Sequence, residues 1–369
     1  MMTTESFSPH PRLAGAIELL SRLISVPSFS REEDKTADIW EEWLKSNDAG
    51  DVKRFHNNVY VVTPDFDPSR PTLMLNSHHD TVRPAASYTR DPFSPTIEDG
   101  RLYGLGSNDA GASGVSLAST FLDLKDRDDL PVNLLLAITA AEECMGELGM
   151  RAMLPRLAEE GLTPDMVIVG EPTGMEPAIA ERGLVVLDAV TEGVSGHAAR
   201  NEGINAIYRA IEDINALRNF SAPTVSPILG PIRVSVTMIN AGTQHNVVPD
   251  RCGYVVDVRT TDAYSNAETV ELLRQAVNYS TLTPRSTRVQ ASVISLDHPL
   301  VVSASGLGLN PFVSPTTSDM ALMHGLPSLK IGPGQSSRSH SADEFVEINE
   351  INAALHLYPK LILNLNEIL

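Results

Sequence analysis

Four short apolar runs, each with a glycine, an acid or a histidine at or soon after its end, constrain the fold of this chain most strongly. The runs cover residues 72–77 (TLMLNS), 132–139 (VNLLLAIT), 166–170 (MVIVG) and 327–331 (PSLKI). Each has the length of a buried strand, and stretches of helical spacing lie between several of them. This alternation predicts an α/β domain with a mostly parallel central sheet flanked by helices.

The middle of the chain has a different order of expected strands and helices, which predicts a second domain. With 369 residues, the chain exceeds the size at which one hydrophobic core keeps growing. The order strand, helix, two strands, helix, strand is expected over residues 183–193, 203–218, 231–240, 251–259, 265–278 and 287–294. This β-α-β-β-α-β order is typical of a compact α+β domain. We therefore expect residues 182–295 to be inserted into a domain formed by residues 1–181 and 296–369.

Acids and histidines follow the apolar runs, where an open α/β sheet places its ligands. They are His78, Glu142, Glu143 and Glu171, and Asp109 and His340 occur in the loop sequences GSNDAG and SSRSHS. Imidazoles and carboxylates in such numbers are the ligands of paired divalent metals, above all zinc. The pattern predicts a metal-dependent hydrolase. His79 is a second candidate ligand beside His78, although the neighbour geometry favours His78.

The spacing also suggests separate roles for these side chains. Asp80 can orient the ring of a ligating His78, since a metal-bound imidazole usually donates its other N–H to a carboxylate. Asp109 can bridge two metals through its two oxygens. The adjacent Glu142 and Glu143 point in different directions, so we assign Glu143 to a metal and Glu142 to general acid/base catalysis.

Charge and composition exclude several classes of function. The net charge of −19 is unsuited to a nucleic acid or an anionic membrane as a partner. Cys144 and Cys252 are too few for a secreted disulfide framework. A signal peptide and an apolar run of membrane-spanning length are both lacking from the sequence, so we expect a cytoplasmic protein.

Seven ordered segments carry a resemblance that covers nearly the whole chain. They read SHHDTV, LYGLGSNDAGASG, AEE, GEPT, GVSGHAARNEGINAI, NVVPDRCGYVVDVRTT and GPGQSSRSHSADEFV. In this order they resemble the zinc-dependent aminoacylase/carboxypeptidase family, which includes acetylornithine deacetylase, succinyl-diaminopimelate desuccinylase and glutamate carboxypeptidases. The resemblance implies two zinc ions, with cobalt or manganese as alternatives, and a homodimer formed through the inserted lid domain.

The resemblance also implies a role for each matching residue. Asp109 would bridge both metals; His78 and Glu171 would complete one site, and Glu143 and His340 the other. Glu142 would be the general base and Asp80 the partner of His78. In the inserted domain, His197 would reach the partner subunit's site and stabilise the oxyanion. The substrate's carboxylate would be held by Asn246, Arg259 and the backbone of Gly332 and Gly334.

Two departures from the family pattern concern the substrate. The family often has Gly-His-Thr-Asp where this chain has Ser77-His78-His79-Asp80, and Met-Lys-Gly-Gly where this chain continues Ala110–Gly114. The missing lysine affects the expected substrate rather than the metals.

Within the family, the segments VGEPTGM and GPGQSSRSHSADEF are most like those of acetylornithine deacetylase and its acyl-citrulline relatives. The expected activity is therefore hydrolysis of an N-acyl amino acid in arginine biosynthesis. Succinyl-diaminopimelate desuccinylase of lysine biosynthesis is the nearest alternative, and a dipeptidase or carboxypeptidase is the third. A metal-containing homologue that binds without catalysis is the alternative from another class.

Overall fold

The computed structural model describes residues 7–200 and 202–369, which form two compact units. The larger unit runs up to Ile179 and resumes over Ile294–Phe312 and Ser318–Leu369. The smaller unit comprises Ala180–Val293 together with the short segment Val313–Thr317. The boundaries expected from the sequence, at residues 181 and 295, lie close to these, but the short segment was not expected to join the second unit.

The regular elements outside the inserted segment alternate as the sequence predicts. In chain order they are α1 (Leu13–Ile24), α2 (Asp34–Ser46), β1 (Lys53–Phe55), β2 (Asn58–Val62), β3 (Thr72–His78), β4 (Thr96–Glu98), β5 (Arg101–Tyr103), α3 (Ala112–Leu124), β6 (Asn133–Thr139), α4 (Met150–Glu159), β7 (Met166–Val169), β8 (Ala178–Glu181), β15 (Ser292–Val293), α7 (Pro299–Gly306), β16 (Phe312–Ser314), β17 (Ser328–Lys330), β18 (Phe345–Glu347) and α8 (Ile348–Leu363).

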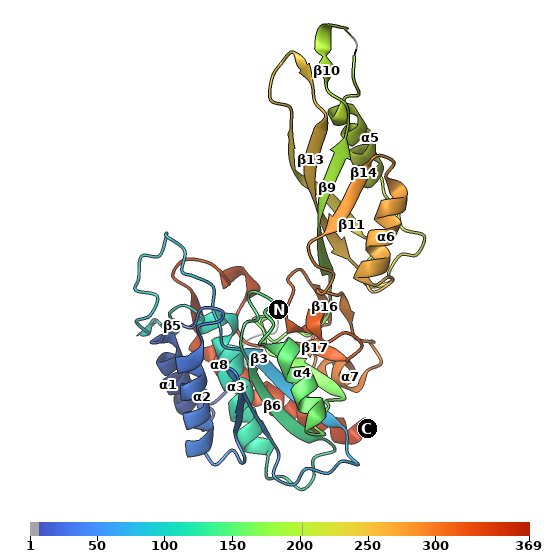
Figure 1. Cartoon of the computed structure of the whole chain (residues 1–369). Helices are drawn as coiled ribbons and strands as arrows, with labels where there is room; N and C mark the ends of the chain where they lie inside the picture. The colour runs from blue at the N-terminus through green and yellow to red at the C-terminus, as the bar shows by residue number, and fades with distance from the viewer. Residues whose placement is uncertain (1–6, 201) are drawn as a thin grey trace. The chain divides into compact units, whose positions relative to one another are not determined.

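One mixed sheet organises these elements (Figure 1). Its strand order among the described residues is β1-β2-β6-β3-β7-β17-β8-β15, with β16 also paired to β8. The four central strands, β6, β3, β7 and β17, run parallel to their neighbours within this group. The strands outside this group are antiparallel. The predicted α/β class with a parallel core is confirmed.

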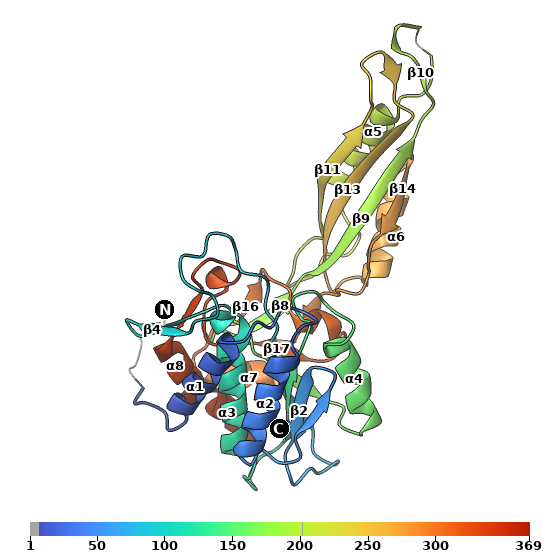
Figure 2. The same cartoon turned by 60° about the vertical axis from the view of Figure 1, so that its left-hand side comes forward.

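Helices cover both faces of the parallel strands (Figure 2). Every residue of β3, β6 and β7 is buried, as expected for parallel strands covered on both sides. Alternate side chains of β3 point to opposite faces. Met74 packs with Met153 of α4, whereas Ser77 lies against Gly114 of α3.

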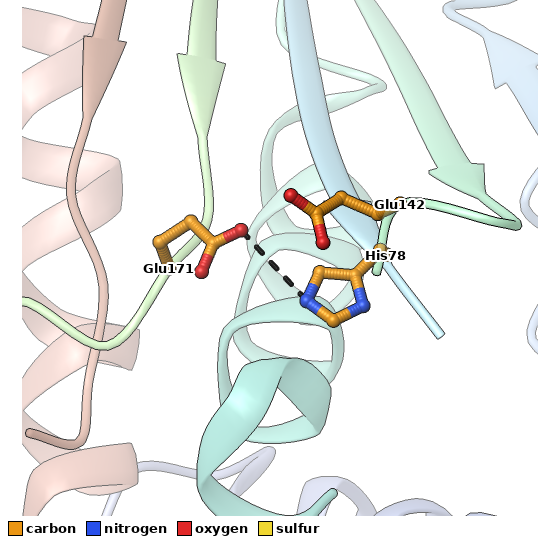
Figure 3. Close-up of side chains that lie close together, drawn as sticks. All are labelled: His78, Glu142 and Glu171. Carbon is orange, nitrogen blue, oxygen red and sulfur yellow. Dashed lines mark ion pairs between the residues drawn. The ribbon is translucent and has the colours of Figure 1, made fainter. Parts of the chain in front are cut away.

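Because the central strands are parallel, their carboxyl ends meet at one edge of the sheet. His78 is the last residue of β3, while Glu142 and Glu171 follow β6 and β7 (Figure 3). The predicted candidate site is therefore built on neighbouring strands.

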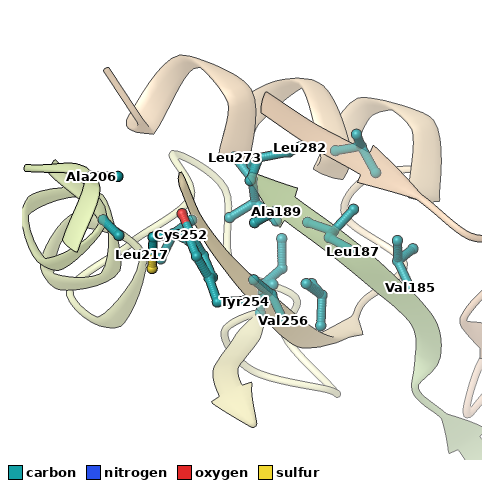
Figure 4. Close-up of a cluster of buried hydrophobic side chains, with 14 residues drawn as sticks. Val185, Leu187, Ala189, Ala206, Leu217, Cys252, Tyr254, Val256, Leu273 and Leu282 are labelled. Carbon is teal, nitrogen blue, oxygen red and sulfur yellow. The ribbon is translucent and has the colours of Figure 1, made fainter. Parts of the chain in front are cut away.

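The second unit is an antiparallel sheet with two helices on one face. It contains β9 (Gly183–Glu192), β10 (Gly196–His197), α5 (Ala206–Arg218), β11 (Arg233–Ala241), β12 (Val247–Val248), β13 (Arg251–Thr260), α6 (Asn266–Ala276) and β14 (Ser280–Pro284). The main sheet has the order β11-β13-β9-β14. Alternate residues of β9 and β13, such as Leu187 and Val256, form the core with Leu217 of α5 and Leu273 of α6 (Figure 4).

The sequence analysis misplaced the last strand of this unit. The strand expected at 287–294 is instead Ser280–Pro284, which pairs with β9. Residues 292–293 pair with β8 in the mixed sheet. The cause is a long-range contact: the buried carboxylate of Asp213 accepts hydrogen bonds from the backbone N–H groups of residues 278–280, which fixes the start of β14.

Among the residues described, none of the helices combines the length and the apolar character needed to cross a membrane.

Candidate metal centre

His78 is oriented so that one ring nitrogen faces two carboxylates. Its Nδ1 lies 3.0 Å from the backbone oxygen of Asp80 and 3.5 Å from the Oδ1 atom of the same residue. With Nδ1–H donating to that carbonyl, Nε2 is the nitrogen left to bind a metal ion. It lies 3.3 Å from Oδ1 of Asp109 and 3.8 Å from Oε1 of Glu171. Asp109 and Glu171 therefore both direct a carboxylate oxygen towards Nε2 of His78.

The second oxygen of Asp109 faces the other candidate histidine. His340 Nε2 lies 3.6 Å from Asp109 Oδ2 and 3.0 Å from Glu143 Oε2. The two carboxylate oxygens of Asp109 thus lie near one imidazole each. This is the geometry that a carboxylate bridging two cations needs.

The chemistry of the donors fits a pair of divalent metal ions. Ligand atoms of His78, Glu142 and Glu171 lie within 4.8 Å of one another, and so do those of His78, Asp109 and Glu143. Nitrogen and carboxylate oxygen are the donors that zinc, cobalt and manganese accept. So many buried carboxylates around two imidazoles need positive charge, and two metal ions would supply it.

The pKa shifts express the same need for positive charge. Burial raises the pKa of Glu171 to about 8, with Asp109 adding repulsion and His78 opposing it. Burial also raises the pKa of Glu142 well above its usual range. His340 has its pKa raised to about 9 by its hydrogen bond to Glu143. For His78, burial acts to lower the pKa, but the surrounding carboxylates outweigh it and hold the pKa well above its usual range.

Two buried carboxylates fix the loop that carries Glu142 and Glu143. Asp80 accepts hydrogen bonds from the backbone N–H of Glu142 at 2.9 Å and of Glu143 at 3.2 Å. Glu33, which is 1% exposed, accepts from the N–H of Ala141 at 3.1 Å. The carboxylate of Asp80 therefore positions the acid pair, while its carbonyl oxygen orients the ring of His78.

Sequence reasoning did not identify Glu33, Glu344 or Lys330 as part of this centre. Glu33 lies in the charged sequence REEDK, where nothing sets it apart from its neighbours, and Glu344 lies in the segment HSADEF, where it received no role. Burial, reinforced by the charge of Asp109, raises the pKa of Glu344 to about 8. Lys330 is 2% exposed, and its charge acts to lower the pKa of Glu171. An apolar strand that contains a lysine was the available signal for Lys330.

His79 does not face the centre. Its Nδ1 lies 2.9 Å from Thr36 Oγ1 and its Nε2 lies 2.8 Å from the backbone oxygen of Asn57. Burial lowers the pKa of His79 to about 4, so the ring is neutral. Both nitrogens are engaged within the fold, which leaves His78 as the ligand candidate of the pair.

The glycines after β17 are needed for close packing. A Cβ at Gly332 would lie 2.6 Å from the backbone oxygen of Glu171, and one at Gly334 would lie 2.4 Å from Asn108 Oδ1. The backbone of Gly332 is also engaged, because its oxygen accepts from Met175 N and its N–H donates to Thr173 Oγ1. The expected contact of Gly332 with a substrate carboxylate would have to replace these bonds.

The three candidates in the second unit do not all lie together. His197 pairs with Val247 in the small β10–β12 sheet, and the backbone oxygen of Asn246 accepts from Ala198 N. Arg259 lies near the other end of β13, eight residues along the strand from Arg251, or roughly 25 Å. Within one chain, Asn246 and Arg259 are therefore too far apart to hold the same carboxylate.

Arg259 already has a carboxylate partner. Its Nε and one of its terminal nitrogens donate to the two oxygens of Asp257, at 2.8 and 3.2 Å. Residues two apart on a strand share a face, which explains the pairing. A substrate carboxylate would have to compete with Asp257.

Comparison with known proteins agrees with this architecture. The model of Peptidase family M20/M25/M40 matches residues 74–364. A succinyl-diaminopimelate desuccinylase of Wolbachia pipientis subsp. Culex pipiens is 26% identical over 373 aligned residues, covering 94% of this chain and 92% of that protein.

Solved structures share the fold over almost the whole chain. An M20 family metallo-carboxypeptidase from Sulfolobus solfataricus aligns with a TM-score of 0.72 at 18% identity, covering 97% of this chain and 100% of the other. The YXEP protein of Bacillus subtilis, described as a dinuclear metal binding peptidase from the M20 family, aligns with a TM-score of 0.74 at 17% identity, covering 97% and 99%. With the family match spanning most of the sequence, the chain belongs to Peptidase family M20/M25/M40 and is a metal-dependent amide hydrolase.

Proposed function

We propose that this protein removes the acyl group from an N-acyl amino acid with the help of two zinc ions. Asp109 would bind both ions through its two oxygens. His78 and Glu171 would hold one ion, and Glu143 and His340 the other. The observation that carries the proposal is that His78 and His340 approach different oxygens of Asp109.

The ions would supply Lewis-acid polarisation of the amide carbonyl and of the attacking water. Glu142 would take a proton from that water and deliver it to the departing amine, so that the amide C–N bond breaks as the new C–O bond forms. Its raised pKa suits a group that must both accept and return a proton near neutral pH. Asp80 would keep Glu142 in place through the backbone bond described above.

For the substrate, we favour N-succinyl-diaminopimelate. The support is that curated relatives aligned over nearly the full chain carry the name succinyl-diaminopimelate desuccinylase. The expectation of an acetylornithine or acyl-citrulline substrate in arginine biosynthesis has no such support, and the same comparisons favour the alternative from lysine biosynthesis.

A matched set of substrates tests this proposal. We would measure release of free amine from the N-acetyl and N-succinyl derivatives of ornithine, citrulline and diaminopimelate, with and without a chelator. Chelator-sensitive hydrolysis of N-succinyl-diaminopimelate above the other five is the expected result. Preference for an ornithine or citrulline derivative would keep the reaction and overturn the substrate. Metal binding without turnover on any of these or on dipeptides would favour a binding protein.

We also propose that two copies associate through the second unit, with His197 of one chain stabilising the oxyanion in the other. The support is that β11 is an edge strand of its sheet and exposes apolar side chains. Helix α5 beside it also exposes an apolar side chain. Met238 and Ile239 of β11 are 65% and 56% exposed, and Tyr208 of α5 is 67% exposed. Edge strands of this kind readily pair with another chain.

Sedimentation at several protein concentrations tests the association. The wild type should be a dimer, and Ile239→Lys should shift it towards monomer, while Val302→Lys, at an exposed position of α7 in the larger unit, should not. Mixed His197→Ala and Glu142→Ala chains should recover part of the activity. Verified heterodimers without recovery would contradict the role of His197 across the interface.

A further inference from the structure

The side chain of Glu344 accepts hydrogen bonds from the loop that carries Asp109. Its Oε1 atom accepts hydrogen bonds from the backbone N–H of Asn108 at 2.8 Å and of Asp109 at 2.9 Å. Its Oε2 atom accepts from the N–H of Gly106 at 3.0 Å. One side chain, 2% exposed, therefore holds three backbone donors of a loop more than 230 positions earlier in the sequence.

The turn held in this way departs from helical geometry at Asp109. Ser107–Gly111 forms a single π-helical turn, but Asp109 has φ −119° and ψ 98°, outside the helical range. The carboxylate of Glu344 is the acceptor of the Asp109 backbone N–H, and it thereby sets where the Asp109 side chain begins.

Glu344 also connects the two halves of the centre. It lies four residues after His340, and its own backbone oxygen accepts from Gly104 N at 2.9 Å. A second tie runs parallel to it, since Asn108 Oδ1 accepts from Gln335 N at 2.8 Å and Asn108 Nδ2 donates to Gln335 O at 3.1 Å. The segment that carries His340 is thus joined to the loop that carries Asp109 on both sides of His340, through Gln335 before it and Glu344 after it.

We propose that Glu344 is a positioning residue for the metal centre: by holding the N–H groups of Gly106, Asn108 and Asp109, it sets the distance between Asp109 and His340. This inference rests on the proposed function, because it assigns to Asp109 the bridging role. Residues that orient metal ligands typically change metal affinity about 10–100-fold when they are replaced.

The neighbouring residue provides a matched control. Asp343 is also a carboxylate that accepts backbone N–H groups, at 2.9 Å from both Thr89 and Arg90. It holds a different loop and makes no bond to residues 104–109 among the contacts of the described chain. Replacing Asp343 therefore changes a comparable carboxylate of the same segment without releasing Asp109.

The experiment compares Glu344→Gln, Glu344→Ala and Asp343→Asn in the full-length protein. A glutamine can keep one accepting oxygen for Asn108 and Asp109 but turns an N–H donor towards Gly106, whereas alanine removes every bond. Zn²⁺ affinity is measured by competition with a chromophoric chelator, and the visible absorption of the Co²⁺-loaded protein reports the ligand geometry. Thermal unfolding of the metal-free proteins checks that each variant folds.

We expect Glu344→Gln to weaken Zn²⁺ binding by roughly 10-fold and Glu344→Ala by up to about 100-fold, with an altered Co²⁺ spectrum in both. Asp343→Asn should keep the wild-type affinity and spectrum. If Glu344→Ala does not fold, the comparison of Glu344→Gln with Asp343→Asn decides. Equal affinity and spectra in those two variants would overturn the inference alone, whereas a wild-type protein that binds no metal would overturn the proposed function together with it.

Discussion

At the scale of single residues, two pairs of adjacent side chains have different surroundings, so substitutions at the two members of a pair should affect the protein differently. Glu142 and Glu143 are held by the same carboxylate, yet Glu143 pairs with His340 while Glu142 lies by His78 and Glu171. The same holds for His78 and His79, of which one faces Asp109 and the other faces Thr36 and Asn57. Substitutions can therefore distinguish the roles of the two members of each pair.

Glu142→Gln should keep both metal ions and lose most of the activity. The amide cannot accept the proton, and general acid/base groups typically contribute about 10²–10⁴-fold to the rate. Metal content by atomic absorption and the turnover number on the best substrate give the two readouts. Glu147→Gln, at a nearby surface acid that pairs with Arg151, should change neither. Loss of metal from Glu142→Gln would make Glu142 a ligand and refute its role as the base.

His79→Ala should destabilise the protein and spare the metals, whereas His78→Ala should lose metal. Removing the ring of His79 deletes its buried hydrogen bonds with the Asn57 carbonyl and the Thr36 hydroxyl, at a cost of roughly 1–3 kcal/mol. Chemical unfolding and metal analysis of the two variants check this. A metal deficit in His79→Ala would return His79 to the list of ligands.

At the scale of elements, the second unit depends on one buried acid of α5. Asp213 accepts from the backbone N–H groups of Asn278, Tyr279 and Ser280 at 2.8, 3.0 and 2.6 Å, and so attaches β14 to the helix. Asp213→Ala should lower the free energy of unfolding of this unit by at least about 2 kcal/mol, since the N–H groups lose a buried acceptor. Glu212→Ala, one position away and exposed, is the control. Calorimetry measures the shift, and an unchanged transition would show that β14 is held by other contacts.

The elements also mark how far the sequence could predict this structure. The parallel strands and the placement of His78, Glu142 and Glu171 follow from local patterns, because apolar runs of strand length identify both the sheet and its ligand-bearing edge. The start of β14 was missed since it depends on Asp213, which is distant in sequence.

The role of Glu344 was not predicted for the same reason. A single sequence tells that a loop contains an acid, but it does not tell which backbone N–H groups that acid will meet more than 230 positions away. By contrast, the pairing of Arg259 with Asp257 was within reach, since residues two apart on a strand share a face.

At the scale of the whole molecule, every metal-ligand candidate belongs to the larger unit, so metal should stabilise that unit alone. A ligand that binds only the folded state adds about 2.7 kcal/mol at a free concentration 100 times its dissociation constant. We expect calorimetry to resolve two unfolding transitions. A chelator should lower the midpoint temperature of one of them, and His78→Ala should lower the midpoint of the same transition. The transition that Asp213→Ala lowers should not respond to the chelator. A single transition affected equally by all three changes would mean that the units unfold together.

The distance in sequence between His78 and His340 has a consequence for the protein as it is being made. On the ribosome, the segment Ala180–Val293 is complete before His340 has been synthesised. At about 5–20 residues per second, the remaining chain takes several seconds more. During that interval the nascent chain holds His78, Asp109, Glu143 and Glu171 but only part of the second half of the centre, and Glu344 has yet to reach the loop of Asp109. Completion of the centre is therefore a late event in biosynthesis, because it needs the segment that carries His340 and Glu344 to return to the sheet on which the first half was built.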